Sequence, residues 1–211
     1  ISGAVRKRKA EKAAVETAAL QESMSASVAE EESKEAEERA AYPYLSGIMG
    51  TAFVKGLQGD DDRYLKIVST PKHFAANNEE HNRFVCNPQI SEKQLREYYL
   101  PAFEACVKDG KSASIMSAYN ALNDVPCTLN AWLLTKVLRK DWGFDGIVMT
   151  DWWAKSNYEG NQAEVPVKAP MVAAQNDIYM VVSDAKANPE NDDVEEMLHA
   201  GKITLGELQR N

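Results

Sequence analysis

Short apolar runs alternate with helix-length amphipathic segments from residue 42 to the end of the chain. Four of the apolar runs have the length of strands, namely residues 66–74, 112–120, 146–150 and 176–183. The helix-length segments are residues 44–59, 91–110, 130–143 and 192–201. Because unbroken apolar strands separated by helices indicate a sheet that is buried on both faces, this pattern predicts an α/β fold with about four parallel strands.

The predicted helices carry capping signals. These are Ser91 with Gln94, Asn130 with Gly143 at the other end, and Thr204 with Glu207. A serine or threonine followed three residues later by glutamate or glutamine forms a capping box, and glycine commonly follows a helix. Pro101 falls inside the segment 91–110 and should kink that helix, because proline removes a backbone donor.

Residues 1–41 have a different composition from the rest. Alanine, glutamate and lysine make up more than half of the first 40 residues, which contain neither an aromatic residue nor proline. We predict a pair of helices here: one over residues 4–23, then a break at "SMSAS", then a second helix that Ser27 and Glu30 cap. This composition resembles that of engineered helices, so we expect a segment unrelated to residues 42–211, in a designed, chimeric or truncated chain.

Charge and composition exclude some classes of function. The 211 residues carry 32 acidic and 24 basic side chains, a net charge of −8, which argues against nucleic acid as a partner. No apolar run approaches the roughly 20 residues that span a bilayer, so we expect no membrane partner. Cys86, Cys106 and Cys127 are interpreted as reduced thiols, with one disulfide pair as the alternative. The residues suggest neither a metal nor a cofactor, and they leave the localisation open.

Polar or otherwise unusual side chains lie at the carboxyl ends of three of the predicted strands. They are Lys72 and His73, Met116 and Tyr119, and Asp151 and Trp152. In α/β folds the functional sites lie at the carboxyl ends of the strands, so we expect these residues to share one hollow. A carboxylate beside indole rings is one way to hold a sugar, whose C–H face packs on the aromatic plane.

The same residues allow a reaction. An ionised Asp151 close to an anomeric carbon can act as the nucleophile in retaining glycoside hydrolysis, while Lys72, His73 and Arg83 donate hydrogen bonds to hydroxyls. Each residue also has a simpler interpretation. The Lys-His pair is compatible with a surface position and the tryptophans with packing. Arg83 is compatible with an ion pair to Glu79 or Glu80, and Asp151 with a turn cap.

Several long motifs carry a resemblance to a known family. The stretches "TPKHFAANNEEHNR", "SIMSAYNALNDVPC" and "WLLTKVLRKDWGFDGIVMTDWWA", in this order, resemble the family 3 glycoside hydrolases, in their β-glucosidase branch, over about residues 43–211. The resemblance implies the second half of a (β/α)8 barrel and a β-glucoside as substrate. It implies Asp151 as the nucleophile, and as residues that line the sugar pocket it implies Lys72, His73, Arg83, Met116, Tyr119 and Trp152.

The chain also departs from the family pattern. The family's sugar-binding arginine is absent from "EAEERAAYPYLSG", and the family's acid/base glutamate belongs to a later domain. Glu79 and Glu80 are candidate substitutes for that acid, and we do not favour them. Three hypotheses follow: an incomplete retaining β-glucosidase, an inactive scaffold, and a weak sugar-binding module. A half barrel leaves sheet edges and an inner face open, so either the N-terminal helices cover the sheet or two copies pair as a homodimer.

Overall fold

The structure is a computed structural model that describes residues 18, 21–28, 34, 41–152, 154, 168–180 and 192–211. It divides into two units, residues 1–42 and residues 43–211. The predicted capping residue Glu30 and all of residues 155–167 and 181–191 lie outside the described part. Within the described part, no helix is both long enough and apolar enough to cross a membrane.

The first unit corrects one expectation. Residues 21–28 form an uninterrupted helix, so the break predicted at "SMSAS" and the role of Ser27 as a helix cap are wrong. The Ser25 hydroxyl donates to the carbonyl of Glu22 at 2.9 Å, and the Ser27 hydroxyl donates to the carbonyl of Met24 at 2.9 Å. Because each hydroxyl is satisfied by a carbonyl three residues earlier, the serines fit within the helix rather than ending it.

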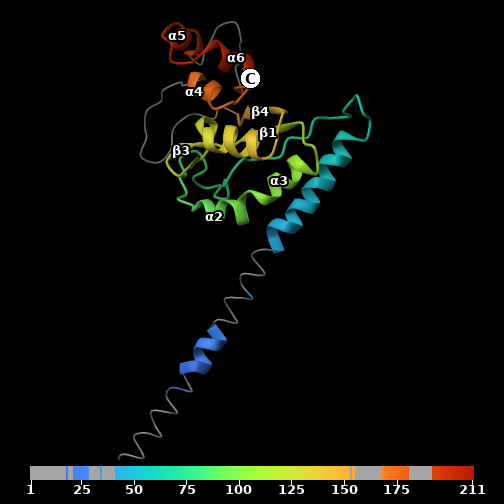
Figure 1. The fold of residues 1–211 in the computed structure, drawn as a ribbon, viewed down its shortest axis with the longest axis vertical. Coiled ribbons are helices and arrows are strands. Elements are labelled where there is room, and N and C mark those ends of the chain that lie inside the picture. Colours follow the sequence, from blue (N-terminus) through green and yellow to red (C-terminus); the bar gives the residue numbers. More distant parts are fainter. Residues whose placement is uncertain are drawn as a thin grey trace, which may run out of the picture. The chain divides into compact units, whose positions relative to one another are not determined.

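The second unit contains a small parallel sheet (Figure 1). Strand β1 (Ser114–Ser117) pairs with β4 (Ile147–Thr150), with Ser114 opposite Ile147 and Ser117 opposite Thr150. Single parallel bridges extend the sheet on both sides, from Phe74 to Ser117 and from Met149 to Ile178. The α/β fold is therefore confirmed, and the four predicted segments lie in chain order. Among the residues that the structure describes, only the two inner segments form strands of more than one residue.

The outer segment 66–74 lies beside β1 without forming a ladder. Phe74 donates to the carbonyl of Met116 at 2.8 Å, and Met116 donates to the carbonyl of Pro71 at 3.2 Å. Pro71 has no backbone N–H, so the ladder cannot continue through it. The peptide bonds Lys72–His73 and Phe74–Ala75 are cis. A full strand over 66–74 was therefore a wrong prediction, although the segment reaches the expected place.

A short hairpin follows β1 that the sequence analysis missed. Strands β2 (Ala121–Leu122) and β3 (Val125–Pro126) pair antiparallel around Asn123 and Asp124, whose φ angles are 50° and 67°. Two consecutive residues with positive φ are typical of the tightest hairpin turns, and asparagine and aspartate tolerate this conformation.

The helices agree more closely with the prediction. The segment 91–110 contains α2 (Glu92–Gln94), the π-helical η1 (Leu95–Tyr99) and α3 (Pro101–Lys108). The capping box of Ser91 and Gln94 is present, and the helix changes type directly before Pro101, where the predicted kink fell. The remaining helices are the 3-10 helix η2 (Cys127–Leu129), the π-helical η3 (Trp132–Asp141), α4 (Lys168–Ala173), α5 (Val194–His199) and α6 (Leu205–Arg210). The capping box of Thr204 and Glu207 begins α6.

The core of this unit lies between the sheet and its helices. Phe74, Ile115 and Val148 from the sheet pack with Leu133 and Val137 from η3, and all five are fully buried. Contacts join α4 to α5, to α6 and to η2, and Figure 1 shows α4, α5 and α6 together near the C terminus.

The helix over residues 43–58 packs against α3 at a small-residue contact. A Cβ at Gly47 would lie 3.1 Å from the Cβ of Ala105, so the two helices approach closely there. Its other side leaves large apolar side chains exposed, among them Leu45, Met49 and Phe53. These side chains lie on a helix and not on the sheet, so covering of the sheet by the N-terminal helices or by a second copy stays a prediction.

Candidate functional site

Asp151 follows the last residue of β4 and is held at the edge of the sheet. Its backbone N–H donates to the carbonyl of Ser117, the last residue of β1, at 3.1 Å. Its side chain is only 9% exposed. One carboxylate oxygen, Oδ1, accepts the backbone N–H of Trp152 at 2.7 Å, and the other, Oδ2, lies 3.0 Å from Nε2 of His73. The carboxylate is therefore buried and has a hydrogen-bond partner for each oxygen.

His73 reaches this carboxylate from the neighbouring segment. Partial burial lowers the pKa of the His73 imidazole below its ordinary value, and the negative charge of Asp151 opposes this effect without outweighing it. Lys72 and Arg83 lower the pKa further through their positive charges. The imidazole is therefore neutral at pH 7, and the tautomer that carries its proton on Nε2 donates to Asp151.

Tyr119 lies near Asp151, after the end of β1. Its hydroxyl donates to the backbone carbonyl of Trp152. Burial raises the pKa of the Tyr119 phenol, and the nearby Asp151 carboxylate raises it further. Tyr119 thus remains protonated near neutral pH and links the end of β1 to the chain that follows β4.

Arg83 is held above the Tyr119 ring, with its guanidinium carbon 5.2 Å from the ring centroid. The same carbon lies 4.9 Å from the centroid of the Phe84 ring, and Nη1 of Arg83 lies 2.7 Å from Oε1 of Glu80. The ion pair with Glu80 was one of the two interpretations of Arg83, and it is present. It does not remove Arg83 from the site, because the arginine also contacts Tyr119.

The structure therefore brings together four of the predicted residues: His73, Arg83, Tyr119 and Asp151. The other three are placed differently. Lys72 is exposed and acts on His73 through its charge. Met116 is almost fully buried in β1, and Trp152 is half exposed directly after Asp151.

Sequence reasoning missed two contributors to this geometry. Ser117 supplies the carbonyl that anchors Asp151, and Phe84 supplies the second ring beneath Arg83. No residue pattern distinguishes Ser117, because a backbone acceptor can belong to any residue. Phe84 follows Arg83 in the chain, so a cationic side chain next to an aromatic one was the only available signal.

The two candidate substitute acids, Glu79 and Glu80, are both engaged with partners other than Asp151. Glu79 accepts the backbone N–H of His81 at 3.0 Å, and Glu80 is largely exposed and pairs with Arg83. In the described part of the chain, no group of three or more histidine, cysteine or acidic side chains could hold a metal ion. Cys106 and Cys127 are buried free thiols, and complete burial raises the pKa of Cys127 to about 12, so it is an inert packing residue.

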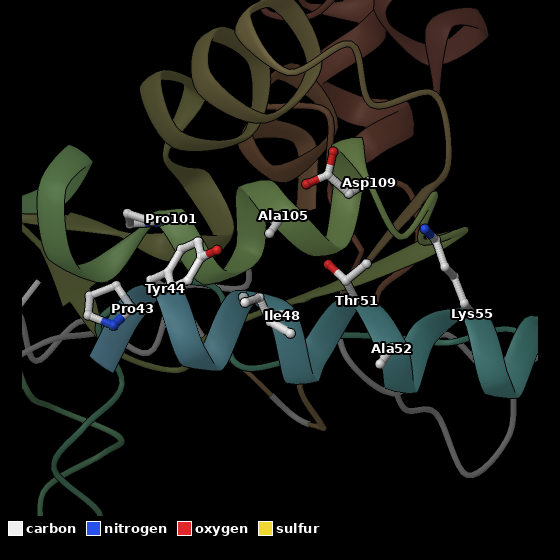
Figure 2. Close-up of a pocket in the computed structure, with 10 residues that line it drawn as sticks. Pro43, Tyr44, Ile48, Thr51, Ala52, Lys55, Pro101, Ala105 and Asp109 are labelled. Carbon is white, nitrogen blue, oxygen red and sulfur yellow. The ribbon is translucent and has the colours of Figure 1, made fainter. Parts of the chain in front are cut away.

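A groove of about 420 Å³ lies elsewhere in this unit, between the helix 43–58 and α3 (Figure 2). Tyr44 and Pro101 stand at one end, and Lys55 and Asp109 stand toward the other. None of the predicted site residues lines this groove. It is therefore separate from the cluster around Asp151.

A family model described as the glycosyl hydrolase family 3 N-terminal domain matches residues 25–211. A β-glucosidase of Ruminococcus albus is 41% identical over 169 residues, which are 80% of this chain and 17% of that protein. An exo-α-(1→6)-L-arabinopyranosidase of Bifidobacterium breve is 39% identical over 148 residues, or 70% of this chain and 19% of that protein. This chain thus spans less than a fifth of the length of these curated relatives.

Solved structures give the same match. A β-glucosidase from Paenibacillus barengoltzii superimposes with a TM-score of 0.71 at 44% identity, over 80% of this chain and 18% of that chain. β-Glucosidase 3B from Thermotoga neapolitana, in complex with glucose, superimposes with a TM-score of 0.67 at 41% identity, over 80% and 22% of the two chains. The family match begins at residue 25, inside the segment that sequence analysis set apart, and these likenesses do not favour a designed scaffold.

Proposed function

This chain belongs to glycosyl hydrolase family 3, and from that membership we propose that it is part of the catalytic domain of a retaining β-glucosidase whose nucleophile is Asp151. The observation that carries the proposal is the Asp151 carboxylate itself. It stands at the carboxyl end of β4, is 9% exposed, and is bonded by neutral donors from His73 and Trp152. A carboxylate in such a position can attack an anomeric carbon.

The neighbouring residues suit a sugar substrate. Arg83 and Lys72 are hydrogen-bond donors for hydroxyl groups, and the half-exposed indole of Trp152 offers an apolar face for a pyranose ring. Several relatives are β-glucosidases, while others are named as an arabinopyranosidase, a xylan 1,4-β-xylosidase and a β-xylosidase. We propose a β-glucoside because β-glucosidases recur among both the sequence relatives and the solved structures.

The proposed reaction proceeds in two displacements. In the first, an oxygen of Asp151 forms a bond to the anomeric carbon, the bond from that carbon to the leaving oxygen breaks, and the leaving oxygen takes a proton from a general acid. In the second, water attacks the same carbon while the bond to Asp151 breaks, and a proton of the water passes to the group that served as the acid. A retaining enzyme holds its two carboxyl groups only about 5–5.5 Å apart. Since Glu79 and Glu80 are engaged with His81 and Arg83, we assign the proton donor to a residue beyond those that the structure describes.

The finer architecture is part of the same proposal. The segment at Phe74, the strands β1 and β4 and the segment at Ile178 follow one another in parallel and in chain order. Such an arrangement is what the second half of a (β/α)8 barrel would present, with its site at the carboxyl ends of the strands.

A dinitrophenyl fluoroglucoside tests the nucleophile without needing the acid. Its leaving group departs without a proton, and the electronegative fluorine beside the anomeric carbon slows release of the sugar, so the intermediate accumulates. We expect mass spectrometry of the intact chain to show one added fluoroglucosyl group, and peptide mapping to place it on Asp151. Fluoroxyloside and fluoroarabinoside analogues compared in parallel test the choice of sugar.

Two variants make this experiment specific. Asp151→Asn should abolish labelling, whereas Asp145→Asn changes an exposed aspartate six residues earlier and should leave labelling unchanged. A chain that folds but takes up no label, or a label on another residue, would contradict the proposal.

A further inference from the structure

Phe84 is an exposed aromatic side chain that touches the candidate site. It is 57% exposed. The Phe84 and Tyr119 rings meet edge to face, with centroids 4.7 Å apart and an interplanar angle of 61°. The guanidinium of Arg83 lies over both rings, at 4.9 and 5.2 Å from their centroids. Two aromatic rings therefore contact one cation.

Glu80 also contacts Arg83. Its side chain is 79% exposed and accepts from Nη1 of Arg83 at 2.7 Å. An exposed ion pair contributes little to stability and is weakened by salt, so it cannot by itself fix the arginine. With the ion pair as its only contact, the Arg83 guanidinium would be free to move with the Glu80 side chain into solvent. The aromatic contacts are the ones that connect Arg83 to Tyr119, whose hydroxyl is bonded to the carbonyl of Trp152.

We propose, on the basis of the function proposed above, that Phe84 is a positioning residue that holds the Arg83 guanidinium against Tyr119, where it can donate to a sugar hydroxyl beside Asp151. Phe84 does not itself touch the reacting atoms. Its ring forms the second wall of a clamp whose first wall is Tyr119. Any residue with an aromatic ring can form this wall. An aromatic replacement of Phe84 should therefore keep Arg83 in place, whereas an aliphatic replacement should not.

The kinetic test follows labelling by the dinitrophenyl fluoroglucoside as its concentration is varied. Phe84→Leu should raise the half-saturating concentration about two- to fivefold, the factor that corresponds to one cation–π contact at an exposed site, with the limiting rate unchanged. Arg83 would bind the sugar equally before and during the reaction, so its loss should affect binding rather than the chemical step. Phe84→Tyr should keep the half-saturating concentration of the wild type. Phe53→Leu, at an exposed phenylalanine on the helix 43–58, is the matched control and should behave as wild type.

A spectroscopic test does not depend on activity. Ring currents from two aromatic faces should shift the δ-methylene protons of Arg83 upfield. Phe84→Leu should move these resonances toward the values of a solvated arginine, and Phe84→Tyr should leave them in place. Unchanged resonances in Phe84→Leu, or a tyrosine variant that fails to restore labelling, would overturn the role of Phe84. If the wild-type chain takes up no label, the proposed function fails, and the resonances alone decide whether Phe84 holds Arg83.

Discussion

We expect the buried ion pair between Arg139 and Asp177 to contribute strongly to the free energy of unfolding. The guanidinium Nη2 of Arg139 lies 2.9 and 2.7 Å from the two oxygens of Asp177, and both side chains are only 13% exposed. Arg139 also donates to the carbonyls of Gly146 and Gln175. Asp177 accepts the backbone N–H of Val148 in β4 at 2.6 Å. The pair therefore ties η3 to the strand that presents the candidate nucleophile.

Arg139→Met leaves the Asp177 carboxylate buried, with the Val148 N–H as its donor. Removing one partner of a buried ion pair costs about 3–5 kcal/mol, because the remaining charge has lost its compensation. A domain is stable by only about 5–15 kcal/mol, so this single change should remove a large share of the free energy of unfolding. Adding Asp177→Asn removes the stranded charge but keeps a carbonyl oxygen for Val148. The double variant should therefore be more stable than Arg139→Met alone.

Urea unfolding followed by circular dichroism measures this double-mutant cycle. The four midpoints, at an unchanged dependence on urea, give the coupling between the two side chains, which we expect to be at least about 1 kcal/mol. An Arg139→Met variant within about 1 kcal/mol of wild type would refute the reasoning. So would a double variant whose loss equals the sum of the single losses, since the charge on Asp177 would then not be the source of the cost.

Two further predictions concern packing and pH. Gly50→Ala would place a Cβ 2.7 Å from Sγ of Cys106 and should lower the free energy of unfolding by about 1–3 kcal/mol in the same urea assay. Gly56→Ala, in the same helix, would place a Cβ with nothing within 4 Å and should raise the free energy of unfolding by about 0.5–1 kcal/mol. Equal effects of the two changes would contradict the close contact at Gly50. Because burial lowers the pKa of His73 below its ordinary value of 6.5, the unfolded chain binds this proton at a higher pH than the folded chain does. The free energy of unfolding should therefore decrease as the pH falls below about 6.5, and His73→Gln should flatten this part of the pH profile. A profile that the substitution leaves unchanged would exclude His73 as the source.

Local signals predicted the helices well. The capping boxes of Ser91 and Thr204 formed because each involves residues three apart, which meet as soon as a helical turn exists. The same kind of local argument went wrong at Ser25 and Ser27. Their hydroxyls can bond either to a new helix start or to the preceding turn, and the sequence does not distinguish the two. The hairpin turn at Asn123 and Asp124 is equally local, because asparagine and aspartate tolerate the positive φ angles that such a turn requires.

The extent of the strands depended on partners far away in the chain. The segment 66–74 has the apolar content of a strand. How much of it pairs is decided by its hydrogen bonds with β1, which lies some forty residues later in the chain. The composition of the candidate site was predictable because polar residues follow the strand ends. Which of them meet was not predictable, since the contact of Asp151 with His73 joins residues from different segments.

The way in which Asp151 is buried bears on the chemistry proposed for it. A buried carboxylate is costly unless it is hydrogen-bonded, and here a neutral imidazole and a backbone N–H supply those bonds. Among the described residues, no lysine or arginine forms an ion pair with Asp151; the charges of Lys72 and Arg83 reach the site from a greater distance, through their effect on His73. An oxocarbenium-like transition state carries positive charge, which the negative charge of Asp151 stabilises. A cationic side chain bonded directly to Asp151 would offset that negative charge. Neutral donors fix the orientation of the carboxylate while leaving its charge available, which is the arrangement that a nucleophile of this kind needs.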